Sequence, residues 1–140
     1  MNVNLINLYE LADENGIEIH HFPTRQVISM SCEGNIAINC DKVETTVQEK
    51  EILAHELGHC ITGAFYYGHS PYELKAQKEY KANKWAVHTL IPYGDLVDAL
   101  INGITERWSL AEYFGVTEKM IDMACKYYED RLIYLRNPEE

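Results

Sequence analysis

The chain has 140 residues, of which 46% are hydrophobic and 24% charged, a composition typical of one globular domain with its own core. Its net charge of −10 disfavours direct binding to nucleic acid, because such binding depends on Lys and Arg side chains that neutralise phosphates. No apolar run approaches the roughly 20 residues that cross a bilayer, and residues 1–16 lack the pattern of a secretion signal. We therefore expect a cytoplasmic protein with no membrane partner.

The four cysteines agree with that expectation. None of them belongs to a CxxC pair, and a disulfide framework is rare in a chain of this size with a normal core. Cys32 and Cys40 are placed so that they can face each other across a hairpin, but we expect reduced thiols in the core.

An N-terminal helix and a small sheet are expected first. Apolar residues recur at helical spacing through residues 3–15, and Asn15-Gly16 is a typical stop signal. The segments GIEIHHF and QVISMS then alternate like strands, and GNIAINC follows a turn-like Glu33-Gly34-Asn35. This pattern predicts a small antiparallel sheet.

Two long helices are expected next. Thr46 and Glu49 form a capping-box pattern at the start of a helix that ends near Gly63. A second helix is expected from about Pro71 to Ile91, followed by a proline that stops it.

Two or three further helices are expected from Asp95 onward, around GDLVDALING, SLAEYFG and TEKMIDMACKYYEDRLIYL. The sequence therefore predicts an α+β fold, with the sheet packed on a helical core. We expect a single domain over residues 1–140, with that core in residues 1–94 and a helical C-terminal segment in residues 95–140.

The stretch ILAHELGHC, residues 52–60, contains the pattern HExxH. Positions i and i+4 of an α-helix lie about 40° apart, so His55 and His59 project from one face and can hold one Zn²⁺ between them. Glu56 lies about 100° round the helix, close enough to take a proton from a water on the metal without acting as a ligand.

The other faces of this helix also carry a pattern. Leu53, Leu57 and Cys60 fall together opposite the histidines, as a stripe that faces the core. Gly58 costs about 1 kcal/mol relative to Ala inside a helix, so we expect it to serve close packing.

A catalytic zinc needs a third protein ligand and an open position. The pattern HExxHxxGxxH is absent, since the chain has Thr62 and Phe65 at the two required places. The candidates further along the chain are His69, Glu73, Glu79 and His88.

We select Glu79 because of the face that it shares. Several mostly small or apolar residues lie within about 60° of it on the helix, as expected where two helices pack closely to share a metal: Ala82, Asn83, Ala86 and Leu90. Asn83 is placed to hydrogen-bond a ligating histidine and fix its tautomer. His88 lies on the solvated side with Lys81 and Lys84, and Glu73 lies near the helix start, where an acid complements the dipole.

The segments ILAHELGHC and EYKANKWAVHTLIP resemble the ImmA/IrrE zinc metallopeptidases, whose second helix has the form ExEANxFAxxLLxP. The resemblance covers roughly residues 10–95, and the interval of twenty positions from His59 to Glu79 is similar to that of the thermolysin-like gluzincins. Two residues depart from the motif: Lys81 replaces its second acid, and Trp85 replaces its Phe. Because a lysine cannot replace a zinc-binding carboxylate, the first departure favours Glu79 over position 81 as the ligand.

The resemblance implies a minimal zincin-like fold, with His55, His59 and Glu79 as zinc ligands and Glu56 as the catalytic acid/base. Members of the family are cytoplasmic and cleave or otherwise inactivate helix-turn-helix repressors, often in mobile elements or stress responses. It therefore implies a zinc endopeptidase with such a repressor as its protein substrate.

Two further features of the reaction are expected. GNIAINC is expected to be an edge strand that aligns an extended substrate through main-chain hydrogen bonds. An oxyanion stabiliser is also expected, with four candidates left open: His20, Tyr66, Tyr67 and Tyr93.

The segment LAEYFGVTEKMIDMACKYY resembles a helix-turn-helix with its turn at Gly115. Between residues 92 and 136, however, five Lys or Arg stand against eight Asp or Glu, so phosphates would be repelled. We expect a structural helical pair or a docking surface for a repressor, in which a stripe of three residues belongs to the core: Met120, Met123 and Tyr127.

Two alternatives to the endopeptidase remain. The first is an antirepressor that sequesters its partner and uses zinc only structurally; Glu56 argues against it, because a structural site has no need of that acid. The second is a DNA-binding regulator with an accidental HExxH, which the charge and the matching second helix disfavour. The oligomeric state stays open.

Overall fold

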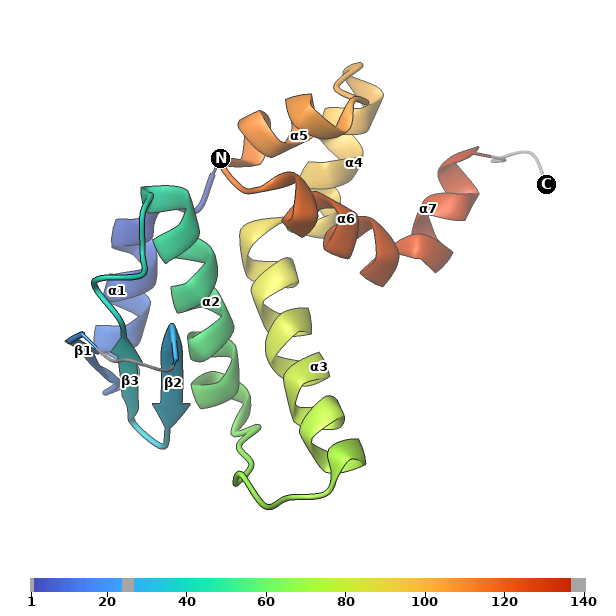
Figure 1. Cartoon of the computed structure of the whole chain (residues 1–140). Helices are drawn as coiled ribbons and strands as arrows, with labels where there is room; N and C mark the ends of the chain where they lie inside the picture. The colour runs from blue at the N-terminus through green and yellow to red at the C-terminus, as the bar shows by residue number, and fades with distance from the viewer. Residues whose placement is uncertain (1, 24–26, 137–140) are drawn as a thin grey trace. The chain divides into compact units, whose positions relative to one another are not determined.

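The computed structural model describes residues 2–23 and 27–136, with side chains as far as residue 132, and has an α+β fold (Figure 1). The chain divides into two compact units, one of Val3–Ala86 and one from Val87 onward. The first unit contains the sheet and the HExxH helix, and the second is helical. The predicted fold class is therefore confirmed, whereas the single domain over residues 1–140 stays a prediction. Within the described ranges, no helix is both long and apolar enough to span a membrane.

The first unit begins with helix α1 (Leu5–Glu14), as predicted. Its first turn is closed by a reciprocal pair of hydrogen bonds, in which the side chains of Asn4 and Asn7 each accept from the backbone N–H of the other. The helix ends at Asn15, and Gly16 takes a positive φ of 68° that suits a residue without a Cβ.

The sheet has three strands, β1 (Glu18–His21), β2 (Ser29–Cys32) and β3 (Asn35–Ile38), in the order β1-β3-β2. β2 and β3 are antiparallel, but β1 and β3 are parallel, so the prediction of a purely antiparallel sheet is wrong. A tight turn with Gly34 at φ 77° joins β2 to β3, so these two strands must run antiparallel. The connection from β1 to β2 is longer, which allows β1 to pair in parallel with the other edge of β3. Strand alternation looks the same in either direction, so it could not reveal this order.

The central position of β3 overturns a second expectation. Both edges of β3 are paired, so GNIAINC does not offer a free edge to a substrate. The edge strands are β1 and β2. Gln26, at the start of the predicted QVISMS strand, lies outside the described residues, and β2 itself begins at Ser29.

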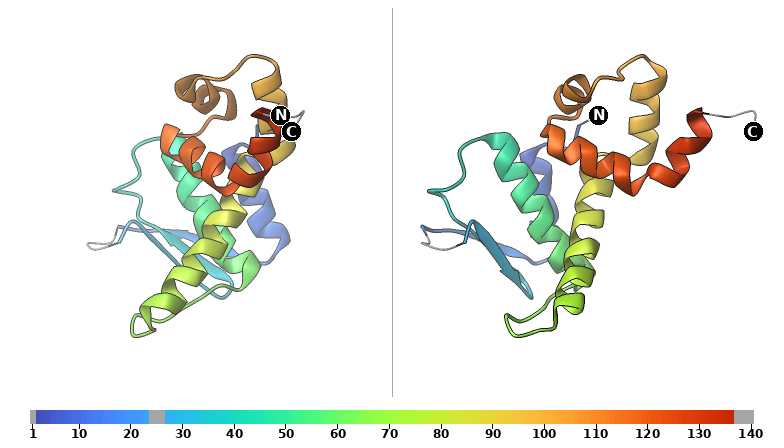
Figure 2. Two further views of the ribbon diagram at one scale, coloured as in Figure 1. Left: turned by 90° about the vertical axis from the view of Figure 1, so that its right-hand side faces the viewer. Right: turned by 45° about the vertical axis from the view of Figure 1, so that its right-hand side comes forward.

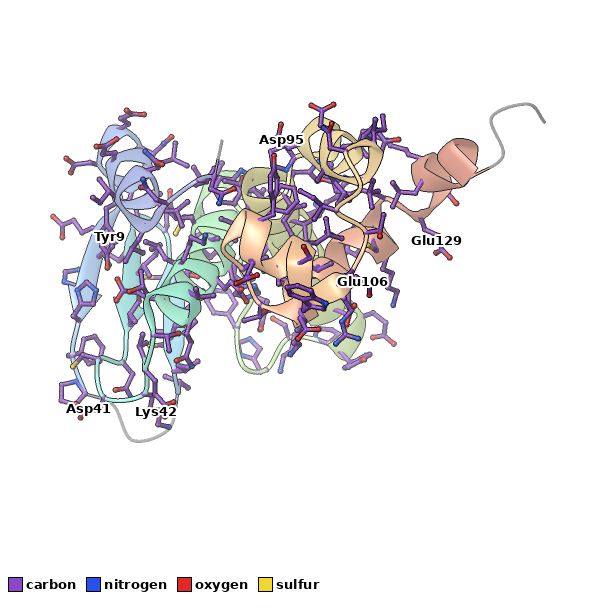
Figure 3. All side chains as sticks on the ribbon, turned by 90° about the horizontal axis from the view of Figure 1, so that it is seen from above. Tyr9, Asp41, Lys42, Asp95, Glu106 and Glu129 are labelled. Atoms are coloured by element: carbon purple, nitrogen blue, oxygen red, sulfur yellow. The ribbon has the colours of Figure 1, made fainter. Side chains whose placement is uncertain are left out.

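Helix α2 (Thr46–Thr62) lies between the sheet and α3 (Tyr72–Leu90), as Figure 1 and the right-hand view of Figure 2 show. The inward-facing residues of the central strand and of α2 are fully buried and form the core of this unit: Ile36, Ile38, Leu53 and Leu57. A hydrogen bond also joins α1 to α2: the hydroxyl of Tyr9, which is labelled in Figure 3, donates to Glu49 Oε2 at 2.8 Å.

The ends of α2 are set by local chemistry. The N-cap is Thr45, whose side chain accepts from the backbone N–H of Gln48, so the predicted capping box at Thr46 is wrong. The side chain of Gln48 accepts from the backbone N–H of Glu44 and not from that of the N-cap. Gly63 ends the helix with φ 69°, the left-handed conformation that glycine adopts readily. The predicted limits of α3 agree with the structure to within one residue.

In the described part of the second unit, four short helices follow α3: α4 (Tyr93–Ile101), α5 (Arg107–Phe114), α6 (Glu118–Tyr127) and α7 (Glu129–Arg136). Glu106, the N-cap of α5, and Glu129, the first residue of α7, are labelled in Figure 3. The single helix predicted over the last stretch is interrupted at Tyr128, which is buried and donates from its hydroxyl to the backbone carbonyl of Ile91 at 2.8 Å. A buried hydroxyl needs such a partner, and the carbonyl of Ile91 supplies it.

Two side-chain predictions are confirmed only in part. The cysteines are free thiols, as expected, but none of the four lies in the core: Cys32 and Cys40 are exposed, and Cys60 and Cys125 are partly covered. In the expected stripe on α6, Met120 is buried, whereas Met123 and Tyr127 are only partly covered.

Candidate metal centre

Helix α2 presents His55 and His59 on one face, one turn apart, because the HExxH stretch is helical throughout. His55 is partly exposed and His59 is buried. The rings stand edge to face with their centroids 4.8 Å apart. Both Nε2 atoms point into the same space, at 3.2 Å from each other.

Helix α3 brings Glu79 to the same space. Glu79 Oε2 lies 3.0 Å from His55 Nε2, and Oε1 lies 3.1 Å from His59 Nε2. The approach of the two helices depends on Gly58, as predicted, since a Cβ there would lie within 3.0 Å of backbone atoms of Ala82. Any larger residue at position 58 would hold α3, and with it Glu79, away from the histidines.

These three side chains form the only group in the described part of the chain that has the make-up and spacing of a metal site. Their ligand atoms lie within 4.8 Å of one another. A tetrahedral ion with ligands at about 2.0–2.1 Å separates them by about 3.3 Å, close to the separations of 3.0–3.2 Å between the three groups. The arrangement therefore fits one small divalent cation.

Hydrogen bonds on the far side of each imidazole favour the tautomer that a metal needs. His55 Nδ1 lies 2.7 Å from Asn83 Oδ1, as predicted, and His59 Nδ1 lies 2.5 Å from the carbonyl oxygen of Ala64. Each Nδ1–H donates to its oxygen, which leaves a lone pair on each Nε2. Two lone pairs and a carboxylate facing one another are mutually repulsive unless a cation lies between them, so the donor set fits a metal.

Glu56 lies beside this group without belonging to it. Its side chain is buried, with an exposed fraction of 5%. Its Oε2 accepts a hydrogen bond of 2.5 Å from the hydroxyl of Ser29 on β2, within the range of a charge-assisted O–H···O⁻ bond. The chain thus holds a second carboxylate next to the ligand set and directs it toward the edge strand.

Tyr66, in the loop between α2 and α3, contacts the same group. Its hydroxyl donates to Glu79 Oε1 at 2.6 Å. This hydrogen bond, burial, and the charges of Glu79 and Glu56 together raise the pKa of Tyr66 to about 12. The hydroxyl therefore keeps its proton at neutral pH and remains a donor.

The remaining candidates take part in other contacts. His69 is exposed and stacks on Tyr67, and His20 is exposed and lies 3.1 Å from Asn35 Oδ1. Glu73 is exposed in the first turn of α3. In the second unit, two further candidates pack against the ring of Tyr128: His88 and Tyr93.

Sequence reasoning missed two contributors to the site. Ser29 is one of two serines in a short strand, and nothing in the sequence distinguishes it from Ser31 as a partner of Glu56. The carbonyl of Ala64 is a backbone group and carries no residue signal at all. The glycine that ends α2 is the one hint, because it turns the chain back so that the next carbonyl can reach His59.

Comparison with known families agrees with this arrangement. The family model Peptidase_M78, IrrE N-terminal-like domain, matches residues 8–126, which include α2, α3 and all four predicted site residues. No curated protein matches the chain. The family match supports a metallopeptidase-type function, and because it covers most of the sequence, the chain belongs to the IrrE N-terminal-like (ImmA/IrrE) peptidase family.

Proposed function

We propose that this protein is a zinc-dependent endopeptidase that cleaves a helix-turn-helix repressor. One observation carries the proposal. The two histidines of α2 and Glu79 of α3 converge like the ligands of one metal ion, while Glu56 lies buried beside them and outside the ligand set. A site that only stabilised the fold would have no use for that second carboxylate.

Zinc is the metal that this donor set favours. Two imidazoles and one carboxylate are the protein ligands of thermolysin-type catalytic zinc. The side chains of His55 and Glu79 are 28% and 36% exposed, so the cluster is open on one side, unlike a structural zinc site that four protein ligands close. When bound, zinc would lower the pKa of its water toward about 7 and polarise a peptide carbonyl.

The chain itself supplies the proton transfer and the orientation of the ligands. Glu56 accepts a proton from the attacking water and passes it to the leaving amine. Asn83 and the Ala64 carbonyl keep both Nε2 atoms turned to the metal position. Tyr66 is the one oxyanion candidate whose described contacts include this cluster, and we assign its hydroxyl to the developing charge on the carbonyl oxygen.

Substrate alignment is assigned to β2. Among the described residues it is an edge strand of the sheet, and it carries the serine that contacts Glu56, so a peptide paired with its outer edge would lie beside the acid/base. This assignment replaces β3, whose two edges are both occupied.

The repressor substrate is supported by family membership and by charge. A net charge of −10 attracts a basic DNA-binding protein and repels nucleic acid. Two acids of α6, Glu118 and Asp122, form ion pairs with Arg107 of the same chain. We extend the proposal to a cytoplasmic protein of a mobile element or stress response that makes no direct contact with DNA.

The test is to incubate the purified, zinc-loaded protein with the helix-turn-helix regulator encoded beside its gene, with and without 1,10-phenanthroline. Regulator fragments that form only without the chelator support the proposal. Intact regulator held in a stable complex would instead support the antirepressor with a structural zinc. Fragments that form equally with the chelator would refute a metal-dependent cleavage.

A further inference from the structure

The contact between Ser29 and Glu56 links the sheet directly to the candidate centre. The hydroxyl of Ser29 donates to Glu56 Oε2 at 2.5 Å, and no other described side chain donates to that carboxylate. Glu56 is buried, so a carboxylate oxygen without a partner there would be strongly destabilising. Ser29 therefore satisfies Oε2, whereas Oε1 has no protein donor among the described residues and retains access to solvent, because no described side-chain oxygen is both fully buried and unpartnered.

The strand holds Ser29 firmly. Ser29 lies opposite the buried Ile38 in the antiparallel pair of β2 and β3. The backbone N–H of Asn39 donates to the carbonyl of Ile28 at 2.8 Å, so the ladder continues past Ser29 on its N-terminal side. The paired backbone fixes the Cβ of Ser29, so its hydroxyl can occupy only the few staggered positions around that atom, and one of them reaches Glu56.

We propose that Ser29 is a positioning residue for the acid/base Glu56: by holding Oε2, it directs Oε1 toward the attacking water. This inference rests on the proposed peptidase function. The bond also joins the acid/base to the strand that we assign to substrate alignment. The same strand then positions both the peptide and the carboxylate, so a peptide in register with β2 lies at a fixed distance from Glu56.

A purely structural role for the same bond makes different predictions. If Ser29 only satisfied a buried carboxylate, its loss would lower stability and leave the turnover of the folded protein intact. A positioning role requires that kcat falls while KM and zinc content hold, because substrate binding does not depend on where Glu56 points. It also requires that a threonine, which keeps the hydroxyl, restores the rate.

The experiment compares Ser29→Ala, Ser29→Thr and the control Ser31→Ala. Ser31 is the next residue on the same face of β2 and its side chain makes no described hydrogen bond to Glu56. Kinetics are measured on a quenched fluorescent peptide selected from a decapeptide library with the zinc-loaded wild type. We expect Ser29→Ala to lower kcat about tenfold to a hundredfold, with KM and bound zinc unchanged. Ser29→Thr and Ser31→Ala should stay within about threefold of the wild type.

A second measurement does not depend on activity. Urea unfolding of the metal-free protein should show Ser29→Ala raising the unfolding equilibrium constant about tenfold. That effect should vanish in a Glu56→Ala background, since the hydroxyl then has no carboxylate to hold.

The outcomes separate the two claims. An unchanged kcat in Ser29→Ala, an equal loss in Ser31→Ala, or the same unfolding effect with and without Glu56 would each overturn the positioning role while peptidase activity stands. If the zinc-loaded wild type cleaves no peptide, the proposed function fails and the positioning role with it. The unfolding measurements on Ser29→Ala, with and without Glu56→Ala, would still show whether the bond between Ser29 and Glu56 forms in solution.

Discussion

Replacing Gly58 with alanine tests whether the close approach of α2 and α3 builds the metal centre. An added Cβ would lie 3.0 Å from both the carbonyl carbon and the Cα of Ala82, and closer still to its carbonyl oxygen. Carbon atoms pack at about 3.5–4.0 Å, so the two helices must separate by about 0.5 Å or more. The obstacle is backbone, which cannot turn aside as the end of a long side chain can.

Two effects of this separation have a size that the structure sets. Overpacking costs about 1–3 kcal/mol, and the higher helix propensity of alanine offsets about 1 kcal/mol of it. We expect a net loss of up to about 2 kcal/mol in the free energy of unfolding. Metal–ligand distances tolerate only about 0.2 Å of error, so a shift of about 0.5 Å between His59 and Glu79 should weaken zinc binding tenfold or more.

Zinc affinity is measured by competition with a fluorescent chelator, and stability by urea unfolding. Gly94→Ala is the matched control, because Gly94 also lies in a helix but has no atom near the position of an added Cβ. The control should bind zinc like the wild type and be no less stable. If Gly58→Ala bound zinc as tightly as this control, the close helix approach would not be what assembles the site.

Four further predictions follow from the same contacts. Glu79→Ala should purify without the single zinc per chain expected of the wild type, as metal analysis would show; full occupancy would mean that another residue is the third ligand. Glu56→Gln should keep its zinc and lose peptide cleavage in the fluorescent assay, and cleavage at the wild-type rate would rule out the assigned base. Asn83→Ala frees the Nδ1 side of His55 and should weaken zinc affinity about tenfold to a hundredfold in the chelator competition. Burial raises the pKa of Tyr128 from 10.0 to about 12, so its contribution to stability is complete below pH 10 and is lost as the pH rises through 12. Tyr128→Phe should flatten that alkaline decline in urea unfolding, at the expense of about 1 kcal/mol at neutral pH from the lost hydrogen bond.

The candidate metal centre was accessible to sequence reasoning because its signals are local to two helices. The spacing of His55 and His59 and the face shared by Glu79 and Asn83 follow from helix periodicity alone. Gly58 stood out for a similar reason, since a glycine inside a helix is unfavourable unless a neighbour needs the space. Each of these residues contacts the partner that its helix face implied.

Contacts between distant segments were inaccessible. Ser29 contacts Glu56, which lies 27 positions further along the sequence. β1 pairs with β3 although β2 lies between them in the sequence. The sequence around these residues would look the same with other partners, because a strand alternates in the same way whichever strand it pairs with.

The sequence by itself determined which side chains share a helix face, His55 with His59 and Glu79 with Asn83, and so predicted the candidate ligands, because residues one helical turn apart lie on one face wherever the helix lies. Only the tertiary structure decided which strand borders the site, which backbone carbonyl orients His59, and which hydroxyl holds Glu56. Those choices depend on how the chain returns on itself after a turn. Their energies come from packing between segments that local composition does not describe.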